Sequence, residues 1–250
     1  MSWATSIAQL NESDTVQFQL RATLTGNYQQ GNVNILTVRS RLDLTYAPVR
    51  NIVFKSQNSS LYQSFSSIRA DNDIFSRNYF YYQPQKRLYP FGIFYLSANY
   101  RRKINARLFG GAGATFQLLN KPSHILKVSA SAVYETSRFK GTVYNLSEYD
   151  GSNFIKLWRG TLYMAGWNYL FDKKLRLYYD AYWQPAFNNC RNYRAQADLG
   201  IELPVWKGLV ITALYSYTHE KVVVAPVKQD DKILTFGIGY TIKYNHRPKL

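Results

Sequence analysis

Apolar and polar residues alternate along most of the chain with a period of two. In residues 16–28, Val16 and Phe18 fall on one face while Gln17 falls on the other. Because successive side chains of a β-strand point to opposite faces, this alternation predicts a strand with one apolar and one polar side. The scheme resumes in residues 33–46 after a Gln-Gly-Asn turn, so the two segments predict a β-hairpin.

The two-faced pattern recurs to the end of the chain and is weakest where both faces are polar, in residues 52–63. It predicts about twelve strands. Their expected spans are 16–28, 33–46, 52–63, 70–82, 89–102, 106–119, 124–138, 153–169, 174–184, 192–203, 209–220 and 232–244.

The predicted strands are longer than the roughly 5–6 residues of a typical globular strand. A tilted strand needs about 9–11 residues to cross a bilayer, and membrane barrels place apolar side chains outward and polar ones inward. We therefore expect an all-β chain: a single antiparallel up-and-down transmembrane β-barrel over residues 16–244, with an N-terminal segment at 1–15 and a C-terminal tail at 245–250. A soluble, lipocalin-like barrel is the alternative fold.

The connections between the predicted strands form two sets. Every second connection is short and marked by proline or a tight turn, as is typical of periplasmic turns. The longest connections, 140–152, 185–191 and 221–231, belong to the other set and are expected outside the cell. An even number of strands then leaves both termini on the periplasmic side. Residues 3–8 resemble the end of a signal peptide, with an ordinary N-terminus as an equal alternative.

Composition removes several classes of protein. The chain has 250 residues, a formal net charge of +16, 46% hydrophobic residues and 16% aromatic residues, which is too apolar for intrinsic disorder. Lys and Arg are spread singly rather than clustered, so the charge does not indicate binding of nucleic acid. One Cys and three His exclude a disulfide scaffold and a Cys/His metal site, and no cofactor is expected. The longest uncharged stretch, 22–38, is interrupted by polar residues, which excludes a transmembrane helix.

If the apolar faces meet lipid, the other faces line a lumen that contains charges of both signs. An arginine-rich, water-filled pore would favour anions, since rings of like charge select ions of opposite sign. Alternatively, Arg and Asp pair across adjacent strands and fill a narrow lumen, which leaves a structural barrel with no conductance. Such a barrel with a plugged lumen would be a subunit of a larger outer-membrane complex. The expected lumen residues are Arg21, Arg39, Arg41, Asp43, Asp71, Asp73, Arg107, Lys127, Glu135, Arg159, Arg176, Asp180, Arg194, Asp198, Glu202 and Lys232.

A third, less favoured function is hydrolysis of membrane lipid, which needs a Ser nucleophile beside a His base. Ser123 with His124, and Ser216 with His219, are the nearby pairs. A three-residue spacing points Ser216 and His219 to opposite faces of a strand, and His124 falls in a predicted periplasmic turn. We therefore expect no enzyme activity.

Basic residues near predicted strand ends are candidates for contacts with the phosphates of outer-membrane lipid and lipopolysaccharide. Solvated, positively charged loops are the alternative. The residues concerned are Arg101, Arg102, Lys103, Arg138 and Lys140.

Five short motifs occur in order along the chain. They are Leu24-Thr25-Gly26-Asn27, Arg41-Leu42-Asp43-Leu44-Thr45-Tyr46, Gly110-Gly111-Ala112-Gly113-Ala114, Asn192-Tyr193-Arg194, and residues 232–240 from Lys232 to Tyr240. With this order and spacing, residues 20–244 resemble the salt-induced outer-membrane protein family, a bacterial β-barrel group with a domain of unknown function. The resemblance implies an outer-membrane location but no activity, ligand or catalytic residue. The eighth predicted strand and the loop at 144–151 depart from the family pattern.

Overall fold

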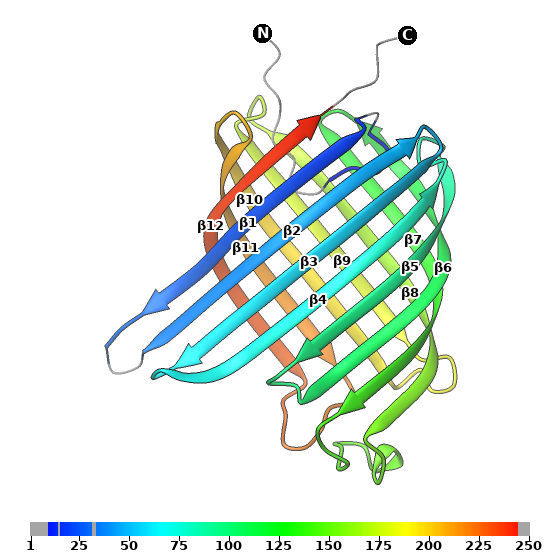
Figure 1. Ribbon diagram of the computed structural model, residues 1–250, viewed down its shortest axis with the longest axis vertical. Helices are drawn as coiled ribbons and strands as arrows, with labels where there is room; N and C mark the ends of the chain where they lie inside the picture. The colour runs from blue at the N-terminus through cyan, green and yellow to red at the C-terminus, as the bar shows by residue number, and fades with distance from the viewer. Residues whose placement is uncertain (1–9, 15, 32–33, 245–250) are drawn as a thin grey trace.

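The computed structural model describes residues 10–14, 16–31 and 34–244. Twelve antiparallel strands follow one another around a closed barrel, and β1 closes it by pairing with β12 (Figure 1). The predicted fold class and strand number are therefore confirmed. The predicted signal-peptide remnant and C-terminal tail lie outside the described residues.

The strands are 11 to 18 residues long. Their bounds are β1 Phe18–Gln29, β2 Ile35–Val49, β3 Ile52–Phe65, β4 Ile68–Tyr82, β5 Leu88–Asn99, β6 Ile104–Lys121, β7 His124–Phe139, β8 Phe154–Leu170, β9 Leu175–Pro185, β10 Tyr193–Trp206, β11 Leu209–Glu220 and β12 Asp230–Tyr244. A short 3-10 helix, Ser147–Tyr149, lies between β7 and β8. No helix in the described ranges is long and apolar enough to cross a membrane.

The register of the strands puts apolar side chains on the outer face of the barrel. At the closure, Leu24 of β1 lies opposite Ile238 of β12, and both side chains are about half exposed. The neighbouring positions Arg21 and Thr25 are buried on the inner face. The sequence alternation thus separates an apolar outer surface from a polar interior.

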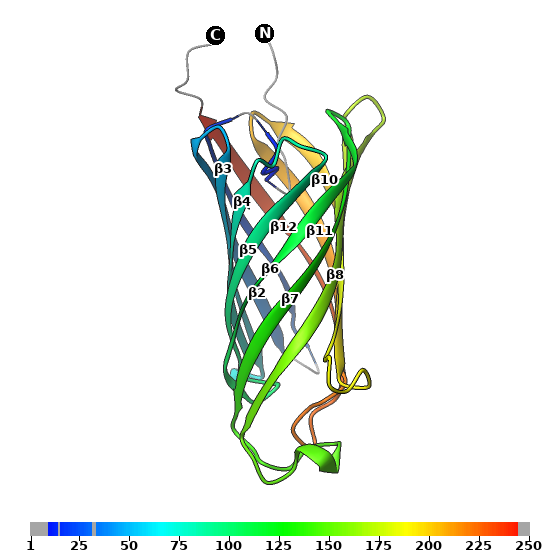
Figure 2. The same ribbon diagram turned by 90° about the vertical axis from the view of Figure 1, so that its right-hand side faces the viewer.

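The two ends of the barrel differ. The described ends of the chain and the short turns after β2, β4, β6, β8 and β10 lie at one end, which we call the terminal end (Figures 1 and 2). The long connections lie at the other end, the loop end (Figures 1 and 2). At the loop end, Tyr144 and Val224 form a β-bridge between the β7–β8 and β11–β12 connections. These residues pack with Phe139, Ile155 and Leu157 in one buried apolar cluster. The two loops therefore fold against the inside of the barrel wall.

Candidate functional site

The structure places almost every predicted lumen residue inside the barrel. The fully buried ones include Arg176, Glu135 and Glu202. Charged groups buried this deeply need partners, because burying an unpaired charge is costly. The others that lie on the inner faces are Arg21, Arg39, Arg41, Asp43, Asp71, Asp73, Arg107, Lys127, Arg159, Asp180, Arg194 and Asp198.

Lys232 is the exception, and the prediction that it lines the lumen was wrong. Its side chain is exposed and shares the outer face of β12 with Leu234 and Phe236. The Nζ atom lies 6.0 Å from the centre of the Tyr217 ring. The cause is strand parity, because residues with even numbers in β12 point outward while Thr235 and its odd-numbered neighbours point inward.

A network of carboxylates and arginines fills the interior toward the loop end. Glu135 of β7, which is 1% exposed, forms ion pairs with Arg159 at 2.9 Å, Arg194 at 2.8 Å and Arg107 at 3.4 Å. Arg107 also pairs with Glu220 of β11. These contacts join strands from opposite sides of the barrel, so they narrow the lumen as well as balance its charge.

The same network takes up two residues expected to face lipid phosphates. Arg102 is buried and pairs with Glu220 at 3.1 Å and with Asp231 at 2.6 Å. Arg101 pairs with Asp71 at 3.2 Å and with Asp231 at 3.0 Å. Both guanidinium groups are thus paired with carboxylates at the loop-end mouth, and Arg101 remains about one-third exposed.

A second ionic group lies nearer the terminal end. Glu202 of β10 accepts hydrogen bonds from Arg21 of β1 and, at 3.3 Å, from Arg176 of β9. The guanidinium carbon of Arg176 also lies 4.7 Å from the centre of the Trp167 ring. Arg41 pairs with Asp43 within β2 at 3.0 Å. Predicted lumen charges are thus paired to a large extent.

The N-terminal segment, residues 10–14, lies inside the mouth of the terminal end (Figure 2). Glu12 is 5% exposed and forms ion pairs with Lys127 of β7 at 2.8 Å and Lys55 of β3 at 3.1 Å. Tyr89 of β5 donates its hydroxyl to Glu12 Oε1 at 2.8 Å. The segment therefore connects three separate strands across the mouth, and we call residues 10–14 the plug.

Three further contacts hold the segment. Lys127 Nζ also donates to Asn11 Oδ1 at 2.7 Å and to Ser13 Oγ at 2.9 Å. Asp14 forms an ion pair with Lys243 at the rim, at 2.9 Å. Lys127 is thus the residue of the wall that makes the most polar contacts with the plug among those described.

The environment of Glu12 favours its ionised form. Burial alone would raise the pKa of Glu12, but the charges of Lys127 and Lys55, together with hydrogen bonds from Lys127 and from the backbone, outweigh burial. The result is a pKa well below the ordinary value of 4.5 for a glutamate. At neutral pH the plug is therefore held by a charged carboxylate.

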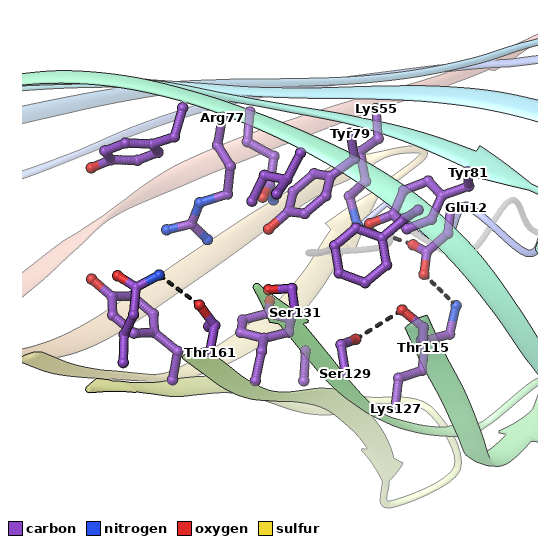
Figure 3. A pocket seen from close by; sticks show the side chains of 18 of the residues that line it. Glu12, Lys55, Arg77, Tyr79, Tyr81, Thr115, Lys127, Ser129, Ser131 and Thr161 are labelled. Carbon is purple, nitrogen blue, oxygen red and sulfur yellow. Dashed lines mark hydrogen bonds and ion pairs between the residues drawn. The ribbon is translucent and has the colours of Figure 1, made fainter. Parts of the chain in front are cut away.

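A cavity of about 90 Å³ lies directly behind the plug. Figure 3 shows Lys55, Arg77 and Tyr79 on one wall facing Ser129 and Thr161 on the other. The cavity wall contains one carboxylate, Glu12, and five basic side chains, although two of the five also pair with Glu135. The basic residues are Lys55, Arg77, Arg107, Lys127 and Arg194.

Arg77 of β4 differs from the other lumen arginines in its partners. Its guanidinium carbon lies 5.8 Å from the ring centre of Tyr95 and 5.9 Å from that of Tyr182. Within the described ranges it forms no ion pair with a carboxylate, and Asp180 acts on it electrostatically from β9. Aromatic faces offset only part of the cost of burying the guanidinium charge, so the cavity retains an attraction for anions.

A second cavity of about 120 Å³ lies on the loop-end side. Its wall is of mixed charge, with Arg39 and Arg41 opposed by Asp73 and Asp198. Arg39 donates to Ser216 Oγ across the barrel at 2.9 Å. This part of the lumen therefore carries little net charge, and the anion-attracting part is the cavity behind the plug.

Sequence reasoning missed Glu12, Lys55, Arg77 and Glu220. Both faces of β3 contain polar residues, so alternation could not assign Lys55 to the interior. Arg77 lies among aromatic residues in β4, where the same ambiguity holds. Glu12 precedes the first strand, and nothing in its local pattern indicates that the segment folds back into the barrel.

The barrel is similar to solved outer-membrane β-barrels. The translocator domain of the autotransporter NalP from Neisseria meningitidis is 16% identical with a TM-score of 0.48, covering 91% of this chain and 89% of that one. The NanC porin is 8% identical with a TM-score of 0.49, over 91% and 99%. An outer membrane channel from Pseudomonas putida F1 is 10% identical with a TM-score of 0.49, over 98% and 99%.

None of the curated proteins compared with the chain matches it. A family model does match, over residues 22–242, which is nearly the whole barrel. The match begins in β1 and ends in β12, so it spans the closed sheet and leaves out the plug. The chain therefore belongs to the family described as "Protein of unknown function, DUF481".

Proposed function

We propose that this protein spans the bacterial outer membrane as a small-solute channel that its own N-terminal segment closes. The apolar outer face supports membrane insertion, because a soluble barrel would not expose this many large apolar side chains. The short turns and both termini then face the periplasm, and the long loops face outward. The resemblance to a salt-induced family would make osmotic stress the setting in which the channel works.

The observation that carries the channel assignment is the arrangement of the terminal end. A cavity with an excess of basic side chains is separated from the mouth by a five-residue segment, Leu10–Asp14, and not by the barrel wall. A plug held by a few polar contacts can leave without unfolding any strand. The solutes that the cavity favours are anions.

A second candidate function, a structural barrel within a larger envelope complex, is favoured by the ionic network at the loop end. Glu135 and Glu220 hold strands together across the lumen there. Such a barrel would conduct nothing and would co-purify with an envelope partner.

The basic residues at the loop end that we assign to contacts with lipopolysaccharide phosphates are Lys103, Arg138 and Lys140.

The proposal excludes lipid hydrolysis. Ser216 lies inside the barrel beside Arg39, whereas His219 lies on the outer face, where its Nδ1 is 2.9 Å from Asp230 Oδ1. The ring of His124 lies beside Asn168 in the β7–β8 pair, with its Nδ1 2.9 Å from Asn168 Oδ1. Neither histidine has the position of a general base for a serine nucleophile.

Single-channel recording in planar bilayers tests the proposal, using the full chain and a variant that lacks residues 1–14. We expect rare openings from the full chain and frequent openings from the variant. Under a salt gradient, the reversal potential should indicate a preference for anions. Both proteins are first checked for a folded barrel by circular dichroism.

Absence of current steps from both folded proteins would contradict the channel and favour the structural candidate. A preference for cations would contradict the assignment of the cavity behind the plug as the selective region.

A further inference from the structure

Glu12 occupies a carboxylate-binding site that is built by the barrel wall. Lys55, Tyr89 and Lys127 belong to β3, β5 and β7, and all three donate to the two oxygens of this one side chain at 2.8 to 3.1 Å. Because these donors belong to strands, they stay in place when the plug leaves. The site is therefore preorganised to bind a carboxylate whether or not Glu12 supplies it.

Leu10 supplies an apolar group next to that carboxylate. It is 1% exposed and lines the same cavity as Tyr81 and Phe91. Both aromatic residues belong to a buried cluster with Tyr79 and Tyr89, in which the rings of Tyr79 and Tyr81 stack at 5.5 Å. The plug thus presents a carboxylate together with an apolar side chain to a pocket of ammonium groups and aromatic faces.

Removal of Glu12 would leave Lys55 and Lys127 in the cavity with no carboxylate among the described residues that line it. An ammonium group that is largely out of water is costly without a counter-charge, so an anion entering the cavity would be stabilised strongly. Aromatic walls favour a flat apolar body over an extended polar one. The chemistry that matches all three features is a small aromatic carboxylate.

We propose that Lys55, Lys127 and Tyr89 form the binding site for a small aromatic carboxylate, and that Glu12 with Leu10 is a tethered competitor which this ligand displaces. This inference rests on the proposed channel function in one respect, since it names the class of solute that the channel takes. Binding of the ligand and docking of the plug exclude each other. The solute itself would therefore release the closed end.

Benzoate is the probe, with benzyl alcohol as the uncharged analogue. Binding to the full chain in detergent is measured by isothermal titration calorimetry for the wild type, Glu12→Gln, the double variant Glu12→Gln/Lys127→Met, and Glu148→Gln. Glu148→Gln is the matched control, because Glu148 is an exposed carboxylate of the β7–β8 connection that accepts from Asn189 and lies neither in the plug nor in the cavity wall.

Glu12→Gln should bind benzoate at least tenfold more tightly than the wild type, because the charged competitor is gone. The double variant should lose at least tenfold relative to Glu12→Gln, and Glu148→Gln should stay within about twofold of the wild type. Benzyl alcohol should bind all four proteins weakly and alike. Circular dichroism confirms that each variant retains the barrel.

Equal affinity of the wild type and Glu12→Gln for benzoate would overturn the proposal, as would the absence of benzoate binding by both proteins. Tighter binding of glucuronate than of benzoate would overturn the aromatic assignment. The measurement involves no membrane and no current. If the protein binds benzoate as expected but conducts no current, only the proposed channel function is contradicted. If the protein conducts but does not bind benzoate, only the proposed binding site is contradicted.

Discussion

Glu135 is the point at which three arginines of the barrel interior meet. Its Oε2 atom pairs with both Arg159 and Arg194. Its Oε1 atom lies 3.4 Å from Arg107 and accepts a hydrogen bond from Ser137 at 2.8 Å. Each guanidinium was taken out of bulk water on folding, and this carboxylate is a shared counter-charge. The residue therefore contributes more to stability than any single surface ion pair, for which the gain is about 0–1 kcal/mol.

Glu135→Gln should destabilise the barrel by about 3 kcal/mol, because it leaves three buried arginines with a neutral partner. Urea unfolding of the protein reconstituted in lipid, followed by tryptophan fluorescence, measures the change. Glu148→Gln is the control, since Glu148 lies in the exposed β7–β8 connection and accepts only from Asn189 at 2.8 Å among the described contacts. A loss below about 1 kcal/mol for Glu135→Gln would contradict the role assigned to this residue.

At the scale of the strand, alternation predicted which residues share a face wherever one face was apolar. It placed Arg21 in β1, Glu135 in β7 and Arg194 in β10 on the inner faces that they occupy. It could not place Lys55 or Arg77, because polar residues lie on both faces of β3 and aromatic residues on both faces of β4. It misplaced Lys232, which shares the outer face of β12 with Leu234 and Phe236.

Other features depend on contacts between segments far apart in the chain. The plug is defined by Glu12 meeting Lys127, 115 positions later in the sequence, and no local pattern encodes that distance. Arg102 also pairs with residues far away in the sequence, because its ion pairs with Glu220 and Asp231 join the β5–β6 turn to β11 and β12. Sequence reasoning predicted that a charged lumen exists but not which charges pair.

Glycines in β6 allow close approach of β7. A Cβ atom on Gly111 would lie 2.1 Å from the carbonyl oxygen of Ala132, whereas one on the adjacent Gly110 would meet nothing closer than 3.8 Å. Gly111→Ala should therefore destabilise the barrel by about 1–3 kcal/mol through displacement of the β6–β7 pair. Gly110→Ala, the matched control, should be neutral or slightly stabilising.

The same urea unfolding assay compares the two glycine variants. Equal stabilities would contradict the close approach of β6 and β7 at this point.

The two ends of the barrel are obstructed in different ways: the loop end is narrowed, and the terminal end is closed by the plug. At the loop end, ion pairs between strands and packed loops form part of the wall itself. At the terminal end, a segment outside the sheet docks through Glu12 and Asp14. The plug can leave while every strand keeps its neighbours, so we assign opening of the channel to the terminal end.

Protonation of Glu12 connects this closure to pH. The pKa of Glu12 is lowered when the segment is docked, so docking is fully stabilised above the ordinary value of 4.5 and weakens as the pH falls below it. Each pH unit below that value should shift the docking equilibrium about tenfold toward the undocked state until the docked carboxylate itself protonates. The charged groups facing Glu12 are Lys55 and Lys127.

The central claim is that Glu12 holds the channel closed, and the open probability in planar bilayers between pH 7 and pH 3 tests it most directly. The wild type should be mostly closed at pH 7 and open increasingly below about pH 4.5. Glu12→Gln should already be open at pH 7 and show little dependence on pH. Identical traces from the two proteins across this range, whether silent or open, would contradict the account.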